Sequence, residues 1–362
     1  MKQYLIILAL LLLSAFANAQ QPPIMLCNPS GTICTPYYSL DSAINDANNG
    51  DYVYLPAGTF VMPTSLSKEI TIYGVGANLD SCNAIGGTTN ILNQFNLDAS
   101  NITLEGINFL SDIVIGTNTQ YNTFNNIKLI FCKLPSLKEA PNYISRLNNS
   151  QVIACYFTGH LTFGAVNFNN AFGSQGSNNF VSNCVLGHLS RAENSIIKNC
   201  IFNALSWPDA INIVYSSTLD NCVFNTTAII AQNSYYGYPS HPNNNVIQNC
   251  YYKNNLFYNT YNGGFGSTYL NNQVVNSTIY NPNNSTYPFN IAQAGANIPF
   301  PVGHSADIQS PHPASLGING GMFPWSEHGC VPSNPHVFYK NIADKTNGST
   351  NLPVNIKVRS GN

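Results

Sequence analysis

The ionisable side chains of this sequence that could do chemistry are concentrated between residues 138 and 210. Within this stretch Glu193 and Asp209 each lie nine residues after a cysteine, Cys184 and Cys200 respectively. If the two cysteines hold equivalent positions in a repeat, the two carboxylates stack on neighbouring turns of the chain. Paired carboxylates act as general acid and base on glycosidic bonds, so Glu193 and Asp209 are candidate catalytic residues.

Arg191 and Trp207 share a second spacing, because each lies seven residues after one of the same two cysteines. The match would place a candidate catalytic cation, Arg191, and an indole ring that can stack on a sugar, Trp207, beside the carboxylates. Counting backward from the following cysteines breaks the match. The alternative that Arg191 and Glu193 form a local pair therefore stays open.

The tripeptide Gly-His-Leu occurs at Gly159–Leu161 and again at Gly187–Leu189. Its recurrence predicts that His160 and His188 lie on neighbouring turns. His188 is then a candidate catalytic residue and His160 a candidate substrate-binding residue. The alternative is that both are turn residues of adjacent coils.

Three tyrosines, Tyr235, Tyr236 and Tyr238, lie in the segment NSYYGYPSHP at Asn233–Pro242. The segment reads as an insertion between repeats, and loops on a rigid scaffold often carry binding residues. The tyrosines are a candidate sugar-stacking patch, although a loop that packs over the coil explains them equally well.

Metal and cofactor chemistry finds little support in the residue types. A zinc site requires Cys or His ligands that converge on one point, and the sequence has no CxxC pair. Calcium requires six to eight oxygen ligands, whereas the whole chain has 15 Asp and Glu residues. We expect no metal and no cofactor, with calcium as a weak possibility.

A repeat of short apolar strands positions these candidates. Segments such as FVSNCVL, IIKNCIF and TLDNCVF alternate with period two and are separated by Asn, Gly, Ser and Thr clusters, which indicate turns. Aligned at one residue each, the segments recur every 16 to 29 residues. The aligned residues are Ile107, Cys132, Cys155, Cys184, Cys200, Cys222, Cys250 and Thr278. Strands at this spacing without intervening helices predict an all-β, right-handed parallel β-helix.

Within the repeat, each Asn-Cys pair has a predicted geometry. The residue two before the cysteine faces outward, so Lys198 and Asp220 should be neighbours. The Asn forms the bend, where a left-handed backbone suits it, and stacked Asn side chains can bond one another. The cysteine points inward as a small, reduced hydrophobe. Four cysteines lie outside this scheme. Cys27 and Cys34 are the best disulfide candidates, whereas Cys82 and Cys330 have no predictable partner.

Composition and termini restrict the function further. Charged residues make up only 8% of the 362 residues and the formal net charge is −2, so the sequence has no basic stripe for nucleic acid. Lys2, the apolar run from Tyr4 to Phe16 and Ala17-Asn18-Ala19 are typical of a secretory signal peptide. No later run is long enough to span a membrane. We expect a secreted, extracellular or cell-surface protein.

Two stretches near the start carry a resemblance to a known family. Asp41–Phe60, DSAINDANNGDYVYLPAGTF, and Ile70–Gly76, ITIYGVG, resemble the opening of right-handed parallel β-helix proteins of the pectin-lyase-like superfamily, where a short capping helix precedes the first coil. Gly317–Trp325 and the final LPVNIKVRSGN resemble the closing segments of secreted β-helix proteins of Bacteroidota-type bacteria.

The resemblance implies four regions. These are a signal peptide at 1–19, an N-terminal segment at 20–38, the β-helix with a short N-terminal capping helix at 39–325, and an extension with a terminal strand at 326–362. The helix is expected over Ser39–Gly50, with a Ser or Asp cap and Gly50 at its end.

Function is less closely determined, because the fold hosts many activities. The sequence lacks the NTD, DD and RIK motifs of polygalacturonase-like hydrolases and has only 13 Lys and Arg residues to bind an acidic polysaccharide. We expect an extracellular protein with a non-catalytic role, either polysaccharide recognition or a cell-surface structural role. The alternative is a polysaccharide lyase or glycoside hydrolase that acts on a low-charge glycan.

Overall fold

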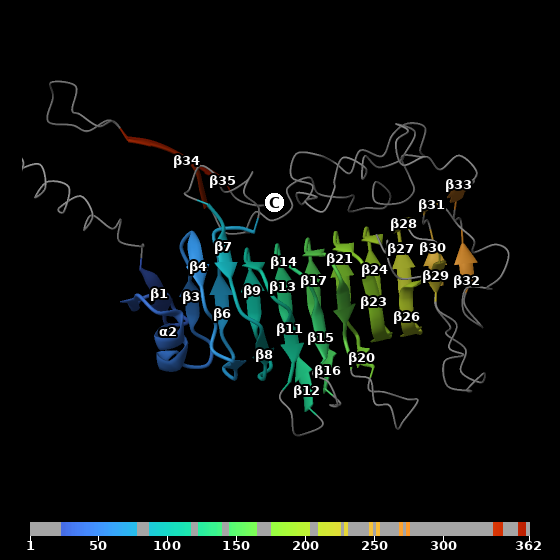
Figure 1. Ribbon diagram of the computed structural model, residues 1–362, viewed down its shortest axis with the longest axis horizontal. Coiled ribbons are helices and arrows are strands. Elements are labelled where there is room, and N and C mark those ends of the chain that lie inside the picture. Colours follow the sequence, from blue (N-terminus) through green and yellow to red (C-terminus); the bar gives the residue numbers. More distant parts are fainter. Residues whose placement is uncertain are drawn as a thin grey trace, which may run out of the picture.

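The computed structural model describes most of the N-terminal two thirds of the chain and short strands beyond it (Figure 1). The described residues are 23–77, 87–116, 122–139, 145–164, 175–202, 209–225, 228–230, 246–248, 251–253, 268–270, 273–275, 336–342 and 354–359. In the main body, three long sheets run side by side along one axis. The chain visits them in turn, so each coil, meaning one turn of the solenoid, adds one strand to each sheet.

The first sheet, sheet A, has twelve strands. In spatial order they are β2 (Cys34–Tyr37), β1 (Ile24–Cys27), β3 (Tyr52–Tyr54), β6 (Thr71–Tyr73), β9 (Thr103–Glu105), β13 (Lys128–Ile130), β17 (Gln151–Ile153), β21 (Phe180–Ser182), β24 (Ile196–Lys198), β27 (Thr218–Asp220), β30 (Val246–Gln248) and β32 (Thr268–Leu270). From β3 to β32 every pairing is parallel and in register. The middle residue of each strand points inward, as Ile72, Leu104 and Leu129 do with no exposed surface.

The second sheet, sheet B, follows sheet A in every coil and consists of ten very short strands. They are β4 (Gly58–Phe60), β7 (Thr89–Ile91), β10 (Asn108–Phe109), β14 (Lys133–Leu134), β18 (Tyr156–Phe157), β22 (Val185–Leu186), β25 (Ile201–Phe202), β28 (Val223–Asn225), β31 (Tyr251–Lys253) and β33 (Gln273–Val275).

The third sheet, sheet C, completes each coil. Its strands are β5 (Ser65–Leu66), β8 (Phe95–Leu97), β11 (Ile113–Ile115), β15 (Leu137–Glu139), β19 (His160–Thr162), β23 (His188–Glu193), β26 (Asp209–Tyr215) and β29 (Ala228–Ile230), and β20 (Gly176–Ser177) pairs with β23 beside this row. Two further pairs complete the elements: parallel β12 (Asn122–Asn125) with β16 (Ser145–Asn148), and antiparallel β34 (His336–Ile342) with β35 (Val354–Arg359). The all-β parallel β-helix predicted from the repeat is confirmed.

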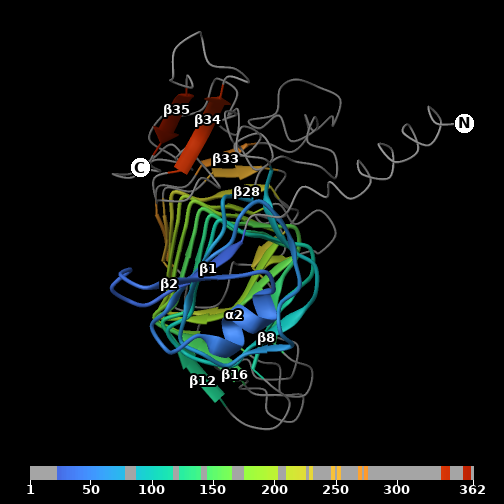
Figure 2. The ribbon, with the colours of Figure 1, turned by 90° about the vertical axis from the view of Figure 1, so that its left-hand side faces the viewer.

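The N-terminal end of the solenoid is covered by a helix and a hairpin (Figure 2). Helix α2 (Leu40–Asp46) begins at the predicted Ser39 cap, whose Oγ accepts a hydrogen bond from the amide of Ser42. It ends at Ala47 instead of Gly50, because the backbone becomes extended at Ala47, and Lys68 donates hydrogen bonds to the carbonyls of Asn45 and Ala47 at this end. Strand β1 pairs antiparallel with β3, and β1 and β2 are joined by the Cys27–Cys34 disulfide.

The bend between sheets A and B has the predicted left-handed backbone. The φ angles of Asn183, Asn199 and Asn221 are 54°, 50° and 55°, and Phe131 and Ala154 adopt the same conformation in earlier coils. The bend makes each amide donate across coils, as Asn199 does to the Asp220 carbonyl at 3.0 Å. The predicted side-chain ladder is wrong at this bend, because the Oδ1 atoms of Asn183 and Asn221 are buried without a hydrogen-bond partner.

At a second bend, between sheets C and A, one pair of Asn side chains from neighbouring coils is hydrogen-bonded. There the Asn126 Nδ2 donates to the Asn101 Oδ1 at 2.9 Å, and both residues have positive φ. Each coil from β9 to β27 thus places a left-handed residue on both sides of its sheet A strand, which gives the chain its two sharp corners.

The cysteines of the repeat form a buried column, as predicted. The five described repeat cysteines are free and fully buried: Cys132, Cys155, Cys184, Cys200 and Cys222. Their thiols donate weakly to backbone carbonyls, as Cys155 does to Leu129 at 3.3 Å, and burial raises the pKa of Cys155 and Cys200 well above its usual value. The sixth predicted member, Cys250, lies outside the described residues, as do Cys82 and Cys330.

Two details of the repeat differ from a uniform alignment. The coil between Cys184 and Cys200 is shortened, because the single residue Arg191 stands where the preceding coil has residues 163–175. The alignment of Thr278 with the cysteines is wrong, because Gln248, two residues before Cys250, pairs with Leu270. The last described coil therefore begins six residues earlier than the sequence pattern indicated.

Candidate functional site

The outer face of sheet C brings together most of the described side chains that the sequence singled out. Leu137, Leu161 and Leu189 are in register on β15, β19 and β23 and are fully buried. Because side chains alternate along a strand, the residues on either side of each leucine face outward. They form two rows across the coils, Asp112, Ser136, His160 and His188 in one and Lys138, Thr162 and Ser190 in the other.

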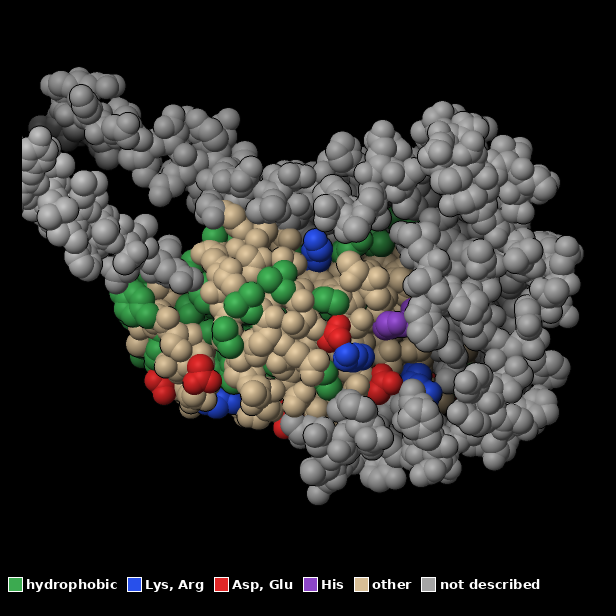
Figure 3. Space-filling model, viewed as in Figure 1, with side chains coloured by type: hydrophobic (Ala, Val, Ile, Leu, Met, Phe, Trp, Pro, Cys, Tyr) green, Lys and Arg blue, Asp and Glu red, His purple; other side chains and the backbone are tan. Residues whose placement is uncertain are grey.

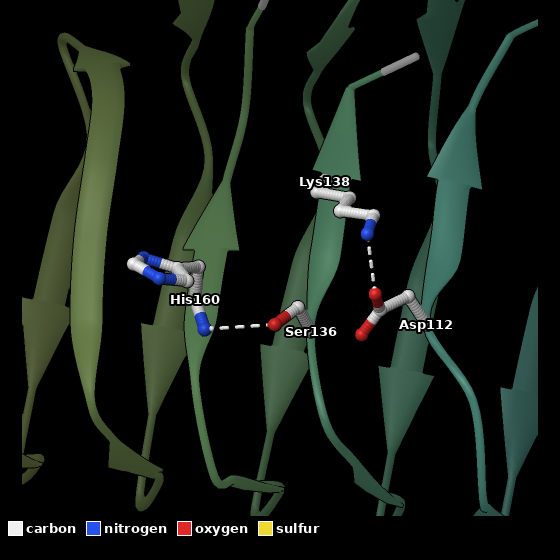
Figure 4. A network of polar contacts seen from close by, with 4 residues as sticks. All are labelled: Asp112, Ser136, Lys138 and His160. Carbon is white, nitrogen blue, oxygen red and sulfur yellow. Dashed lines mark hydrogen bonds and ion pairs between the residues drawn. The ribbon is translucent and has the colours of Figure 1, made fainter. Parts of the chain in front are cut away.

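Two polar contacts link the coils of β11, β15 and β19 on this face (Figure 4). The Lys138 ammonium contacts the Asp112 carboxylate at 2.5 Å, and the Ser136 hydroxyl accepts a hydrogen bond from the backbone amide of His160 at 3.1 Å. On the second row, Thr162 and Ser190 hydroxyl oxygens lie 2.8 Å apart. Figure 3 shows acidic, basic and histidine side chains gathered on one face of the solenoid.

The predicted neighbourhood of the two Gly-His-Leu motifs is confirmed. His160 and His188 are Cα partners, and their rings lie edge to face with centroids 5.1 Å apart. The preceding glycines are required by close stacking of the turns, because a Cβ on Gly187 would lie 2.6 Å from the Gly159 carbonyl oxygen. His188 is buried, whereas His160 is half-buried. Burial lowers the pKa of His160; Asp112 opposes this effect and Lys138 adds to it.

Arg191 occupies a corner of the coil. In the preceding coil, residues 163–175 connect β19 to β20. In β23 a single residue, Arg191, makes the same connection: Ser190 before it pairs with β19, and Ala192 after it pairs with β20. To turn in one residue, Arg191 adopts a left-handed φ of 58°. Its side chain is only 8% exposed, and its Nη1 is buried without a hydrogen-bond partner. Desolvation lowers the pKa of this guanidinium.

Glu139, at the end of β15, is the counter-charge to Arg191. The register places the two residues two coils apart, with backbones about 9.6 Å from each other. Burial raises the pKa of the Glu139 carboxyl, and the positive charges of Arg191 and Lys138 oppose this effect. The structure therefore holds a carboxyl and a guanidinium, both largely desolvated, at one corner of the polar face.

The predicted stack of Glu193 and Asp209 is wrong. Glu193 ends β23 and pairs with Tyr215, whereas Asp209 begins β26 and pairs with Ala228 in the following coil. The equal spacing from the cysteines does not give equivalent positions, because residues 203–208, after β25, have no counterpart between β22 and β23. Trp207, Tyr235, Tyr236 and Tyr238 lie outside the described residues.

The sequence pattern did not assign Asp112, Glu139 or the Thr162–Ser190 pair to the site. Their signal is the sheet C register, in which a leucine or isoleucine is flanked by polar residues in successive coils. Alignment on the cysteines, which precede sheet B, does not reveal it because the number of residues between the sheets varies. The neighbouring positions of Lys198 and Asp220 on sheet A are confirmed.

The described residues contain no group of three or more His, Cys, Asp or Glu side chains arranged to hold a metal ion. Within this part of the chain, no helix has the length and apolar character needed to cross a membrane.

The stacked parallel strands fit the β-helix fold of the pectin-lyase-like superfamily. Residues 38–253, more than half of the chain, match the family model described as rhamnogalacturonase A/epimerase, pectate lyase-like. The chain belongs to this family, which indicates a polysaccharide-related function. Neither the curated proteins nor the solved structures contain a significant match to the chain.

Proposed function

We propose that the protein recognises a polysaccharide on the outer face of sheet C. The observation that carries this proposal is the pair of polar rows on consecutive coils, in which imidazoles, hydroxyls and the Lys138–Asp112 ion pair alternate along the solenoid. Parallel strands repeat about every 4.8 Å, so the half-buried members of the rows, Asp112, Lys138, His160 and Ser190, offer hydrogen-bonding groups on successive coils. Since Lys138 and Asp112 neutralise each other, the surface formed by the coils of β11, β15 and β19 favours a glycan of low charge.

The binding proposal is tested by affinity electrophoresis of the full-length mature protein in gels that contain individual plant and bacterial polysaccharides. His160→Ala and Ser190→Ala should weaken retardation at least several-fold in the gel that retards the wild-type protein. Thr218→Val, on the outer face of sheet A, is the matched control and should leave it unchanged. Equal retardation of all four proteins would contradict this site.

A second candidate function is polysaccharide cleavage at the corner of the same face. It is favoured by the partly buried carboxyl of Glu139, whose raised pKa suits a proton donor, and by the positive charge of Arg191 that acts on it. In this candidate His188 and Arg191 keep the catalytic roles expected from the sequence, with Glu139 added. The paired carboxylates Glu193 and Asp209 do not form part of it, because the register separates them.

Product release from a polysaccharide panel, with and without calcium, distinguishes the two functions. Cleavage requires new reducing ends, or unsaturated ends that absorb near 235 nm, and loss of activity in Glu139→Gln and Arg191→Gln. Glu193→Gln should retain activity. Binding without product in any polysaccharide supports recognition alone.

We further propose that recognition takes place outside the cell. The Cys27–Cys34 disulfide supports this location, because stable disulfides belong to oxidising compartments. The predicted cleavage after Ala19 lies outside the described residues. N-terminal sequencing of protein from the culture medium or cell surface should begin at Gln20, and retention of Met1 in a cytosolic fraction would contradict export.

A further inference from the structure

A cluster of three tyrosines lies on a different sheet from the polar face. Tyr52 and Tyr54 are on β3 and flank Val53, which is fully buried, so both phenol rings project from the outer face of sheet A. Tyr73 on β6 is the Cα partner of Tyr54. The three rings therefore stand together at the N-terminal end of the solenoid.

The rings are stacked on one another. The centroids of Tyr54 and Tyr73 are 5.2 Å apart with the planes 19° from parallel, and Tyr52 lies 6.1 Å from Tyr73 at 27°. Tyr73 covers one face of the Tyr54 ring, yet 42% of Tyr54 is exposed. The remaining exposed surface must include the opposite ring face or the hydroxyl edge, so an aromatic surface is held rigidly toward solvent.

The surroundings of the cluster are polar but uncharged. Thr71 and Thr103 continue the row that starts at Tyr52, and both are half-buried, outward-facing strand residues. Glu105, which follows Tyr73 in the other row, is only 3% exposed, and the first basic side chain of these rows is Lys128, one coil further on. A ligand on this surface meets phenol rings, threonine hydroxyls and Met25 of β1, the partner of Tyr54, and the two rows carry no exposed charge on β3, β6 and β9.

We propose that Tyr54, supported by Tyr52 and Tyr73, forms a second glycan-binding site, which takes an uncharged pyranose of a polysaccharide chain. The C–H face of a pyranose packs against an aromatic ring, and its hydroxyls bond to phenol and threonine hydroxyls, so sugar and surface match in both apolar and polar groups. A charged ligand finds no exposed partner here. Because the rings already stack on one another, their orientation is fixed before the ligand binds, which reduces the ordering cost.

The site is separate from the polar face, since it lies on sheet A and the polar face lies on sheet C. Each therefore has its own test. A polysaccharide bound at both would contact the solenoid on two of its faces, whereas a short oligosaccharide would occupy only one.

The test measures retardation of the full-length mature protein in gels that contain neutral polysaccharides of pyranose units, such as galactan, xylan and glucomannan. We expect Tyr54→Ala to weaken binding to at least one of them five-fold or more. Tyr54→Phe keeps the ring and should stay within two-fold of the wild-type protein. Tyr38→Ala removes a more exposed tyrosine outside the stack, 72% exposed, and serves as the matched control without effect.

A second measurement does not depend on variant folding. Nitration by tetranitromethane, followed by peptide mass spectrometry, should modify Tyr54 in the free protein more slowly once the retarding polysaccharide is added, while Tyr38 is modified at an unchanged rate. Unchanged binding in Tyr54→Ala together with unprotected Tyr54 overturns the site, as does a wild-type protein that no neutral polysaccharide retards.

The two sites fail separately. Loss of binding in His160→Ala but not in Tyr54→Ala supports sheet C and overturns the tyrosine site. Loss in Tyr54→Ala alone does the reverse.

Discussion

His160 and His188 are partners on consecutive strands of sheet C, and their rings meet edge to face with centroids 5.1 Å apart. The backbone enforces this contact, because Gly159 and Gly187 stack closely at the turn and leave no room for a Cβ on Gly187. Imidazoles at this distance repel each other when both are charged. The polar face is therefore expected to depend on pH in the range in which histidine titrates.

Folding stability should fall as the pH is lowered from 7 toward 5, in part through His160. Burial lowers the pKa of His160 in the folded protein, whereas the unfolded value is about 6.5. Below that value the unfolded chain takes up a proton that the folded state resists, so acid favours unfolding. Urea denaturation of His160→Gln should show a smaller loss of stability between pH 7 and 5 than the wild-type protein. An equal loss in both proteins would exclude a contribution from His160.

Glu139→Gln should stabilise the protein at pH 7. The folded-state pKa of Glu139 is raised by burial, so the ionised carboxylate is disfavoured in the folded state, and glutamine resembles the neutral acid. As the pH falls through the raised pKa, the wild-type carboxyl binds its proton in the folded state first, and the advantage of glutamine should disappear near pH 4. Denaturation curves of both proteins at pH 7 and 4 measure this difference.

The same change tests the interaction with Arg191. In an Arg191→Gln background the opposing positive charge is gone, so Glu139→Gln should stabilise more than it does alone. A double-mutant cycle should give a coupling of about 0.5 kcal/mol, at the low end for interacting residues because the two groups do not form a direct ion pair. Zero coupling would show that Arg191 does not influence Glu139.

Most of the fold could be predicted because its signals are local. Alternating strands, left-handed Asn residues and inward cysteines recur within a few residues of each other, and the sheet A register follows from them directly. The exceptions are informative: Phe131 and Ala154 hold the same left-handed bend without the residue type that favours it. Asn side chains bond to each other at the bend between sheets C and A instead, where Asn126 reaches Asn101.

The candidate site was harder to predict because it depends on distances across several coils. The number of residues between the cysteine and the sheet C strand varies among the coils, and an error in that number moves a side chain along the sheet. The predicted stacking of Glu193 on Asp209 was wrong for this reason. The predicted pairing of His160 with His188 was correct because the Gly-His-Leu motif lies at sheet C itself.

Because position 183 lies in a left-handed bend, replacing Asn183 by glycine should destabilise the fold less than replacing it by alanine. Its φ is 54°, and its buried Oδ1 has no hydrogen-bond partner that substitution would remove. Since a Cβ costs about 1 kcal/mol or more in this conformation, Asn183→Gly should be about 1 kcal/mol more stable than Asn183→Ala. At the neighbouring strand residue Ser182 the order should reverse, with Ser182→Ala the more stable by about 0.5 kcal/mol or more. Chemical denaturation of the four variants compares both positions, and the same order at both would contradict the bend geometry.

The cysteine column should remain reduced even in an oxidising compartment. Neighbours on parallel strands are about 4.8 Å apart, whereas the Cβ atoms of a disulfide lie about 3.5–4.5 Å apart, and the buried thiols are inaccessible to oxidants. Iodoacetamide should label none of Cys132, Cys155, Cys184, Cys200 and Cys222 in the native protein, and all five in urea without reductant.

The N-terminal pair provides the internal control for this experiment. Cys27 and Cys34 form a disulfide, so they should resist labelling in urea and become reactive only after reduction. Peptide mass spectrometry distinguishes the two sets in one sample. A disulfide between any two members of the column would require adjacent strands to move closer than the β-helix spacing allows, and its detection would contradict the stacked arrangement of the coils.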